Sequence, residues 1–275
     1  MGEPRPSDEI LGYYALGLEQ GRLEEDYFPL ERARTQELIG RHLAPPPGVV
    51  LDVGGAAGAY AFWLAQAGYE VHLVDPVPLH VEQAQATSSG RGSGRLASAR
   101  VGDARSLPFA DSSADAVLLL GPLYHLTELE DRVRALGEAL RVLRPGGVVF
   151  AAAISRYASL VDGLRGALFE DPAFVAMVER DLAYGQHRNE TGDARYFTTA
   201  YFHQPAELAE EIAAAGLALI DVLAVEGPAA TMPDFARRWA DAVARERLMG
   251  LLRAVESEPT LLGVSPHLLA VGRRP

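Results

Sequence analysis

One short stretch of the chain places glycines beside a carboxylate, a combination that can bind a cationic ligand. It reads Leu51-Asp52-Val53-Gly54-Gly55-Ala56-Ala57-Gly58. An apolar run precedes the glycines and a helix-length run follows them, so we expect a strand, a turn and a helix here. Glycines at the carboxyl end of a strand let a ligand approach the backbone closely. The carboxylate of Asp52 favours a ligand with positive charge over one with a pyrophosphate.

A dinucleotide-binding loop is the alternative interpretation of these glycines. The fingerprint G-x-G-x-x-G, started at Gly54, requires glycine at position 56, where this chain has Ala56. An NAD-dependent oxidoreductase therefore stays open as an alternative, but Ala56 and the carboxylate of Asp52 both disfavour it.

Two further carboxylates follow expected strands. Asp75-Pro76 ends the second expected strand, and Asp103-Ala104 follows the third. A carboxylate suits a vicinal diol because each of its oxygens can accept one hydroxyl proton. Taken alone, Asp75 also fits a helix cap and Asp103 a turn residue. Their order and spacing after Asp52 together favour a ligand-binding role.

This pattern resembles that of the class I S-adenosylmethionine-dependent methyltransferases, whose motif has the form acidic-x-Gly-x-Gly-x-Gly. Asp52, Gly54 and Gly58 match it, and Ala56 stands where the middle glycine usually is. The resemblance covers residues 48–154 and implies that S-adenosylmethionine is the cofactor.

The resemblance also implies which residues bind that cofactor. Asp75 looks like the residue that accepts hydrogen bonds from both ribose hydroxyls, and Asp103 like the one near the adenine amino group. The implied cofactor-binding residues are Asp52, Gly54, Gly55, Ala56, Gly58, Asp75, Pro76, Asp103, Ala104 and Gly121. No metal is expected, because the histidines show no paired spacing and Asp115 begins the fourth expected strand instead of ending it.

The acceptor side offers three candidate catalytic residues. A methyltransferase needs a general base only when the methyl acceptor is a protonated hydroxyl, a protonated amine or an acidic carbon. Tyr124 and His125 follow the fourth expected strand, and His203 lies just before a helix that starts at Pro205. Either histidine could instead cap a helix, and His125 could instead hold a backbone carbonyl.

Aromatic residues are the candidates for contact with the acceptor. Tyr201 belongs to the dense aromatic segment 195–203, which we expect to line the acceptor pocket. Tyr13 and Tyr14 either close over the cofactor or pack the N-terminal segment on the core. The sequence does not separate these two roles.

Composition excludes several classes of function. The net charge of −12, from 37 acidic and 25 basic residues, disfavours nucleic acid and anionic membranes as partners. The chain has no lysine, which rules out Schiff-base chemistry, and no cysteine, which rules out disulfides and thiol nucleophiles. The first ten residues, with two prolines and three acidic residues, do not resemble a secretory signal. We therefore expect a cytoplasmic protein.

Apolar runs alternate with amphipathic ones, which predicts an α/β fold. Strands are expected at 49–53, 70–74, 97–102, 116–120, 148–154, 217–225 and 267–273. We expect a Rossmann-like, doubly wound, seven-stranded sheet, mostly parallel, with an N-terminal helical cap and a helical insertion. The resemblance implies that the seventh strand is antiparallel.

The chain divides into four parts on this interpretation. They are a tail and helical cap (1–47), the cofactor-binding core (48–154), a helical insertion or lid over the acceptor pocket (155–203), and the rest of the sheet with a long helix at 234–257 (204–275).

The sequence thus predicts a methyltransferase that acts on a small molecule, with natural products and peptides among the possible acceptors. A protein of this fold that binds S-adenosylmethionine without transferring methyl is a second alternative. The methylated atom, the acceptor and the oligomeric state stay open.

Overall fold

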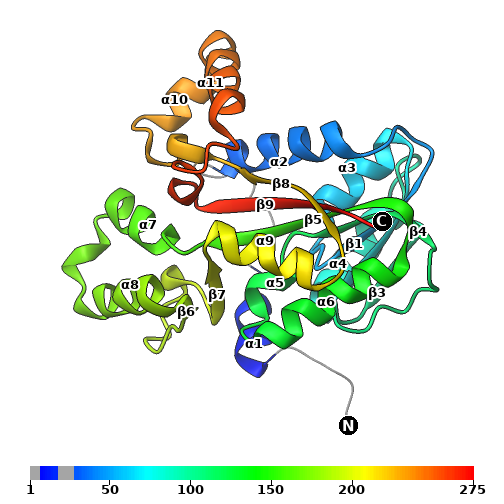
Figure 1. Ribbon diagram of the computed structural model, residues 1–275, viewed down its shortest axis with the longest axis horizontal. Helices are drawn as coiled ribbons and strands as arrows, with labels where there is room; N and C mark the ends of the chain where they lie inside the picture. Colours follow the sequence, from blue (N-terminus) through cyan, green and yellow to red (C-terminus); the bar gives the residue numbers. More distant parts are fainter. Residues whose placement is uncertain (1–6, 18–27) are drawn as a thin grey trace.

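The computed structural model describes residues 7–17 and 28–275, which form a central sheet with helices on both faces (Figure 1). Its parallel part follows the order β3-β2-β1-β4-β5. These strands are β1 (Val49–Val53), β2 (Glu70–Asp75), β3 (Ser98–Val101), β4 (Ala114–Leu119) and β5 (Leu143–Ser155). The strand order reverses between β1 and β4, and ligands of open α/β sheets bind in the crevice at such a point.

Two more of the seven predicted strands join this sheet, which has nine strands in the described part of the chain. β9 (His267–Arg273) pairs antiparallel with β5, and β8 (Ala218–Ala224) pairs antiparallel with β9. The predicted Rossmann-like architecture and the antiparallel last strand are therefore confirmed.

Helices cover the two faces of the sheet because β-strand side chains point alternately to opposite sides. Leu51 and Val53 pack in one apolar cluster with α6 (Leu129–Val142) and α9 (Pro205–Ala214). Val50 packs in the other, on the opposite face. The helices on that face are α2 (Phe28–His42), α3 (Ala59–Ala67) and α4 (Pro78–Ser89).

The insertion contains two short strands that the sequence did not predict. Its helical parts are α7 (Ala158–Gly166), α8 (Pro172–Tyr184) and the short 3-10 helices η2 (Leu168–Glu170) and η3 (Ala194–Tyr196). β7 (Ala200–His203) pairs in parallel with the end of β5, and β6 (Gln186–His187) pairs antiparallel with β7. The insertion is thus attached to the sheet at the carboxyl end of β5.

The helix predicted at 234–257 is two helices, α10 (Phe235–Ala240) and α11 (Ala242–Val255). Asp241 interrupts it: its Oδ1 accepts hydrogen bonds from the backbone N–H groups of Val243 and Ala244 at 2.9 and 3.1 Å. A side chain that caps a helix in this way starts a new one. Two 3-10 helices, η4 (Gly227–Thr231) and η5 (Leu262–Val264), lie between the last elements.

The predicted N-terminal cap contains α2 and the short α1 (Asp8–Tyr14), while residues 1–6 and 18–27 lie outside the described part. α1 is joined to the insertion through the Glu9 carboxylate, which accepts hydrogen bonds from the Thr199 hydroxyl at 2.7 and 2.8 Å. None of the helices in the described residues is long and apolar enough to cross a membrane.

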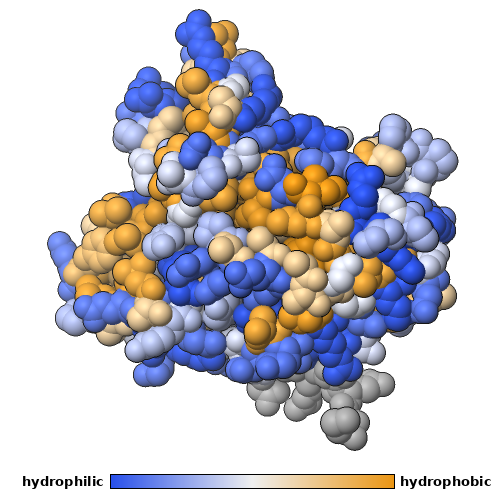
Figure 2. Space-filling model, viewed as in Figure 1, coloured by the Kyte–Doolittle hydropathy of each residue, from blue (hydrophilic) through white to orange (hydrophobic). Residues whose placement is uncertain are grey.

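Apolar side chains are exposed on β8 and on α11, which projects from the body of the protein (Figures 1 and 2). Leu219 and Ile220 of β8, and Val243 and Leu251 of α11, are exposed. None of the four lines the cavities described below.

Arg34 fixes α2 against the C-terminal part of the chain. Its side chain is completely buried, donates to the Glu256 carboxylate at 2.5 Å and to the Val225 carbonyl at 3.2 Å, and also pairs with Glu37. Removing Arg34 would leave the Val225 carbonyl without this donor, whereas Glu256 would keep two hydrogen bonds from Arg41, at 2.5 and 2.8 Å. The expected loss is therefore that of buried, charge-assisted hydrogen bonds and not of a whole ion pair.

We therefore expect Arg34→Met to lower the free energy of unfolding by about 2 kcal/mol. Arg253 is the control, because it also pairs with Glu37, at 2.6 Å, but from an exposed position. Arg253→Met should change stability little. Urea unfolding of the three proteins measures this, and equal losses in the two variants would contradict an anchoring role for Arg34.

Candidate active site

A cavity of about 820 Å³, the main cavity, opens at the carboxyl ends of β1, β2 and β4. It lies where the strand order reverses, as expected for this class of sheet. The glycine turn after β1, the end of β2 and the turn after β4 all contribute lining residues. Nine of the ten predicted cofactor-binding residues line it: Asp52, Gly54, Gly55, Ala56, Asp75, Pro76, Asp103, Ala104 and Gly121.

The glycine turn needs its small residues for two physical reasons. Gly54 has φ +72°, and a Cβ there would lie 2.7 Å from Pro122 Cδ in the turn after β4. Gly58, which does not line the cavity, has φ +94° and begins α3. Ala56 also has a positive φ, 48°, although it is not glycine. That backbone conformation explains why glycine suits position 56, where this chain departs from the motif.

Asp52 is buried beneath this turn. It is 1% exposed, and neither carboxylate oxygen has a hydrogen-bond partner among the described residues. Burial, and then the neighbouring charge of Asp75, raise the pKa of Asp52 to about 7. A cationic group placed beside Asp52 would remove both penalties, so the site is built for positive charge.

Asp75 holds the backbone just before α4 and also lines the main cavity. Its Oδ1 accepts from the backbone N–H of Val77 at 2.9 Å, at the start of α4, and faces His80 Nδ1 at 3.0 Å. Its Oδ2 accepts from the Ala56 N–H at 2.8 Å. The carboxylate therefore holds the turn and the helix together while it lines the main cavity.

Asp103 corresponds more closely to the turn interpretation. Its carboxylate accepts from the Arg105 backbone N–H at 2.8 Å and pairs with the Arg105 guanidinium at 2.8 and 2.9 Å. These bonds fix the loop after β3, and Asp103 still lines the main cavity.

A second cavity of about 230 Å³, the side cavity, lies between the body of the protein and the insertion. Tyr14, Tyr124 and His267 line both cavities, so the two adjoin. Aromatic residues dominate the side cavity; they include Tyr13, Phe174, Tyr196, Phe197 and Phe202.

His125 lines the main cavity but both of its ring nitrogens are engaged. Nδ1 lies 3.2 Å from the Thr199 carbonyl, and Nε2 lies 2.6 Å from the Tyr14 hydroxyl. With the proton on Nδ1, the Tyr14 hydroxyl donates to Nε2. Burial lowers the pKa of His125 to about 4. The geometry therefore matches the alternative in which His125 holds a backbone carbonyl.

The structure corrects the placement of His203 and Tyr201, which line neither cavity. His203 is completely buried, with Nε2 3.2 Å from a Glu211 oxygen, and the Tyr201 ring lies under the Arg132 guanidinium at 3.9 Å. The reason is the alternation of β7, in which Phe202 faces the side cavity and its two neighbours face the opposite side.

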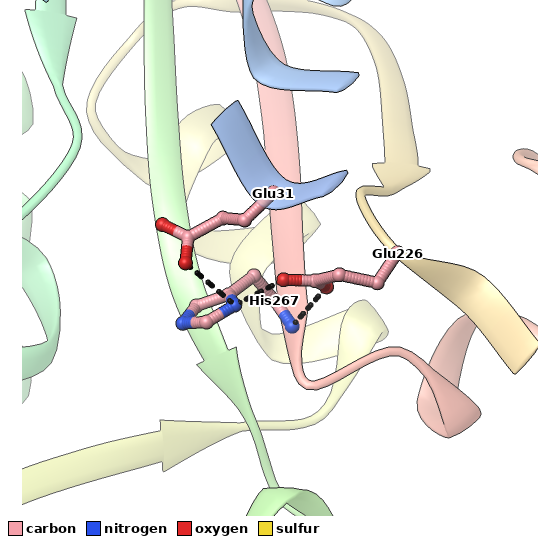
Figure 3. Close-up of side chains that lie close together, drawn as sticks. All are labelled: Glu31, Glu226 and His267. Carbon is pink, nitrogen blue, oxygen red and sulfur yellow. Dashed lines mark hydrogen bonds and ion pairs between the residues drawn. The ribbon is translucent and has the colours of Figure 1, made fainter. Parts of the chain in front are cut away.

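Glu31, Glu226 and His267, none of which was predicted as a site residue, lie close together (Figure 3). His267 Nδ1 lies 2.5 Å from Glu226 Oε1 and 4.0 Å from Glu31 Oε2. The sequence could have predicted that Glu226 and His267 lie close together. Glu226 follows the strand expected at 217–225, and His267 begins the strand expected at 267–273. If these two strands pair antiparallel, the end of the first lies beside the start of the second.

Comparison with known proteins identifies the family. A model of a methyltransferase domain matches residues 51–151. A ubiquinone biosynthesis O-methyltransferase from Methylocella silvestris is 31% identical over 206 residues, which cover 70% of this chain and 72% of the relative. The chain belongs to the class I S-adenosylmethionine-dependent methyltransferases. Its cofactor is S-adenosylmethionine, whose sulfonium and ammonium suit the uncompensated carboxylate of Asp52.

Other matches agree with this assignment. A ubiquinone/menaquinone biosynthesis C-methyltransferase, UbiE, from Acidiphilium cryptum is 35% identical over 151 residues, and the alignment spans 54% of this chain and 57% of that relative. A methyltransferase structure from Methanosarcina mazei has a TM-score of 0.57 at 16% identity and covers 86% of this chain and 96% of its own. The [4+2]-cyclase SpnF has a TM-score of 0.61 at 20% identity and covers 100% and 98%. At these identities the two structures show the fold alone. The NAD-dependent alternative has no support among these matches.

The low pKa of His125 predicts a specific loss of stability in acid. Its pKa is about 4 in the folded chain and 6.5 when unperturbed, so the unfolded chain binds more protons between these values. The stabilisation is complete above pH 6.5 and declines by at most about 1.4 kcal/mol per pH unit down to pH 4. Urea unfolding at several pH values should show a shallower decline for His125→Gln than for the wild type. Parallel pH curves would contradict the assignment.

Proposed function

We propose that this methyltransferase acts on a small, mainly apolar acceptor that binds in the side cavity. The observation that carries the proposal is the connection of an aromatic side cavity to the main cavity through Tyr14, Tyr124 and His267. Aromatic rings favour flat or apolar ligands, and a volume of about 230 Å³ suits one small ring system.

The chain's own residues position the two reactants. S-adenosylmethionine supplies a methyl group that its sulfonium activates, so an acceptor needs placement more than it needs strong catalysis. In the proposed arrangement Asp52 holds the cationic part of the cofactor. Asp75 faces the ribose hydroxyls of the cofactor, and Asp103 and Ala104 lie near its adenine. The backbone of the glycine turn lies against the cofactor.

The N-terminal helix α1 keeps water from the reactants in this proposal. Tyr14 lines both cavities and donates to His125, and Glu9 of the same helix bonds Thr199 of the insertion. Tyr13, which lines the side cavity, packs edge-to-face on Phe197 with ring centroids 5.5 Å apart. The helix and the insertion thus hold each other over the site.

The relatives support an organic acceptor and leave the accepting atom open. One is named for ubiquinone biosynthesis as an O-methyltransferase, and another for ubiquinone and menaquinone biosynthesis as a C-methyltransferase. The net charge of −12 argues against nucleic acid as the acceptor, and the absence of cysteine agrees with a cytoplasmic location.

The test is transfer of labelled methyl from S-adenosylmethionine to a panel of small aromatic compounds, peptides, RNA and DNA, with products identified by mass spectrometry. The proposal expects labelled small aromatic products only. Labelled nucleic acid or peptide without any labelled small molecule would contradict it.

A side-cavity substitution should separate acceptor binding from cofactor binding. Ala194 lines the side cavity but not the main cavity, and it is half-buried, so Ala194→Trp can fill space there without disturbing the core. We expect the KM of an accepted compound to rise at least about tenfold while calorimetry gives an unchanged affinity for S-adenosylhomocysteine.

Thr191→Trp is the matched control, because Thr191 is exposed on the same insertion and lines neither cavity. It should leave the KM unchanged. An unchanged KM in Ala194→Trp as well would place the acceptor elsewhere.

A further inference from the structure

The pair Glu226–His267 lies where the main and side cavities adjoin, since His267 lines both. The Nδ1 of His267 is 2.5 Å from Glu226 Oε1, a distance typical of a strong hydrogen bond with an ionised partner. Figure 3 shows that the other ring nitrogen lies on the side of the imidazole away from Glu226.

The carboxylate of Glu226 is held in a fixed position. It is completely buried, and its Oε2 accepts from the His267 backbone N–H at 3.1 Å. The Ser265 hydroxyl lies 2.9 Å from the same oxygen and 2.7 Å from the His267 carbonyl, and it donates its one proton to either. Ser265 Oγ in turn accepts from the backbone N–H groups of Glu226 and Gly227 at 3.1 and 3.0 Å. These bonds direct Oε1 at the His267 imidazole.

This contact determines the tautomer of His267. An ionised carboxylate accepts hydrogen bonds and donates none. Opposite an ionised Glu226, the proton of the neutral imidazole therefore stays on Nδ1, and Nε2 carries the lone pair that can accept a proton. When Nε2 takes up a proton, the imidazolium that forms has the Glu226 carboxylate beside it and Glu31 Oε2 at 4.0 Å. A histidine oriented by a buried carboxylate is the arrangement of a general base.

A metal ion fits these three residues less well than a proton does. They bring one ligand atom each within 4.8 Å of one another, which is close enough for a cation. However, neighbouring ligands of an octahedral ion lie about 3 Å apart when each is about 2.1 Å from the ion. Nδ1 and Glu226 Oε1 are 2.5 Å apart, so a shared proton explains their separation better.

His125, one of the two histidines that the sequence offered as catalytic candidates, is a poorer base than His267. Its two nitrogens face Thr199 and Tyr14, and burial lowers its pKa to about 4 without a carboxylate within hydrogen-bond distance.

We propose that His267, positioned by Glu226, is the general base for an acceptor hydroxyl, which makes the enzyme an O-methyltransferase of phenols or alcohols. This rests on the proposed function. The acceptor oxygen forms a bond to the methyl carbon while the carbon–sulfur bond breaks and its electron pair returns to sulfur. The hydroxyl proton moves to His267 Nε2, and solvent later removes it.

The test compares two hydroxyl probes of similar shape, 1-naphthol and the much more acidic 4-nitro-1-naphthol. With 1-naphthol, His267→Gln and Glu226→Gln should lower kcat about 10²- to 10⁴-fold with little change in KM. With 4-nitro-1-naphthol, already ionised at the assay pH, the same variants should lose less than about tenfold. His72→Gln, a histidine on β2 that lines neither cavity, is the control and should behave like the wild type.

A second readout needs no turnover. With S-adenosylhomocysteine bound, and at a pH where free 4-nitro-1-naphthol is mostly protonated, the wild type should bind the probe with the absorption spectrum of the naphtholate. His267→Gln should bind it as the neutral naphthol.

Equal losses on both probes, a naphtholate spectrum in His267→Gln, or no binding of either probe would overturn the proposal. Calorimetric binding of Mg²⁺ or Zn²⁺ that is lost in His267→Gln would replace it with a metal site. If S-adenosylhomocysteine itself fails to bind, the fault lies in the proposed function and not in the assignment of the base.

Discussion

The carboxylate of Asp52 is buried at the end of the central strand, with no hydrogen-bond partner among the described residues and with Asp75 near it on the next strand. Burial, and then the neighbouring charge of Asp75, raise the pKa of Asp52 to about 7. A ligand that brings positive charge offsets both effects. In the proposed arrangement, attraction between Asp52 and the cationic part of S-adenosylmethionine contributes to the affinity for the cofactor.

The surrounding structure keeps this arrangement in place. The reversal of strand order between β1 and β4 opens the main cavity, and the close contact of Gly54 with Pro122 brings the turns after these two strands together. Asp75 links the glycine turn to α4 through Ala56 and Val77. Each of these contacts joins segments that are distant in sequence, so the site forms only when the sheet does.

The strand ends were predictable because parallel strands place their carboxyl ends at one edge, whatever the details of the helices. The lining positions of Asp52 and Asp75 follow from that rule. His203 and Tyr201 were wrongly predicted to line the site. Side chains alternate along the four-residue strand β7, so a shift of one residue decides which of them face the cavity. The break at Asp241 escaped prediction because the residues on both sides are helix-forming.

The acceptor side was less predictable because it depends on contacts between separate parts of the chain. The side cavity exists only where α1, the insertion and the start of β9 meet, and the sequence contains no local pattern for such a junction. His125 and His267 illustrate this: both are histidines at the ends of elements, yet one is held by a carbonyl and a tyrosine and the other by a buried carboxylate.

The most direct test of this account is calorimetric titration with S-adenosylmethionine between pH 5.5 and 8.5, in buffers of different ionisation enthalpy. If Asp52 must lose its proton to receive the cofactor, affinity should weaken by up to about tenfold for each pH unit below 7 and level off above it. At the lowest pH values of this range, close to one proton should be released for each cofactor molecule bound. Asp52→Asn should bind more weakly and without this pH dependence. A wild-type affinity that does not change across this range, with no proton released, would contradict the central role of the buried charge.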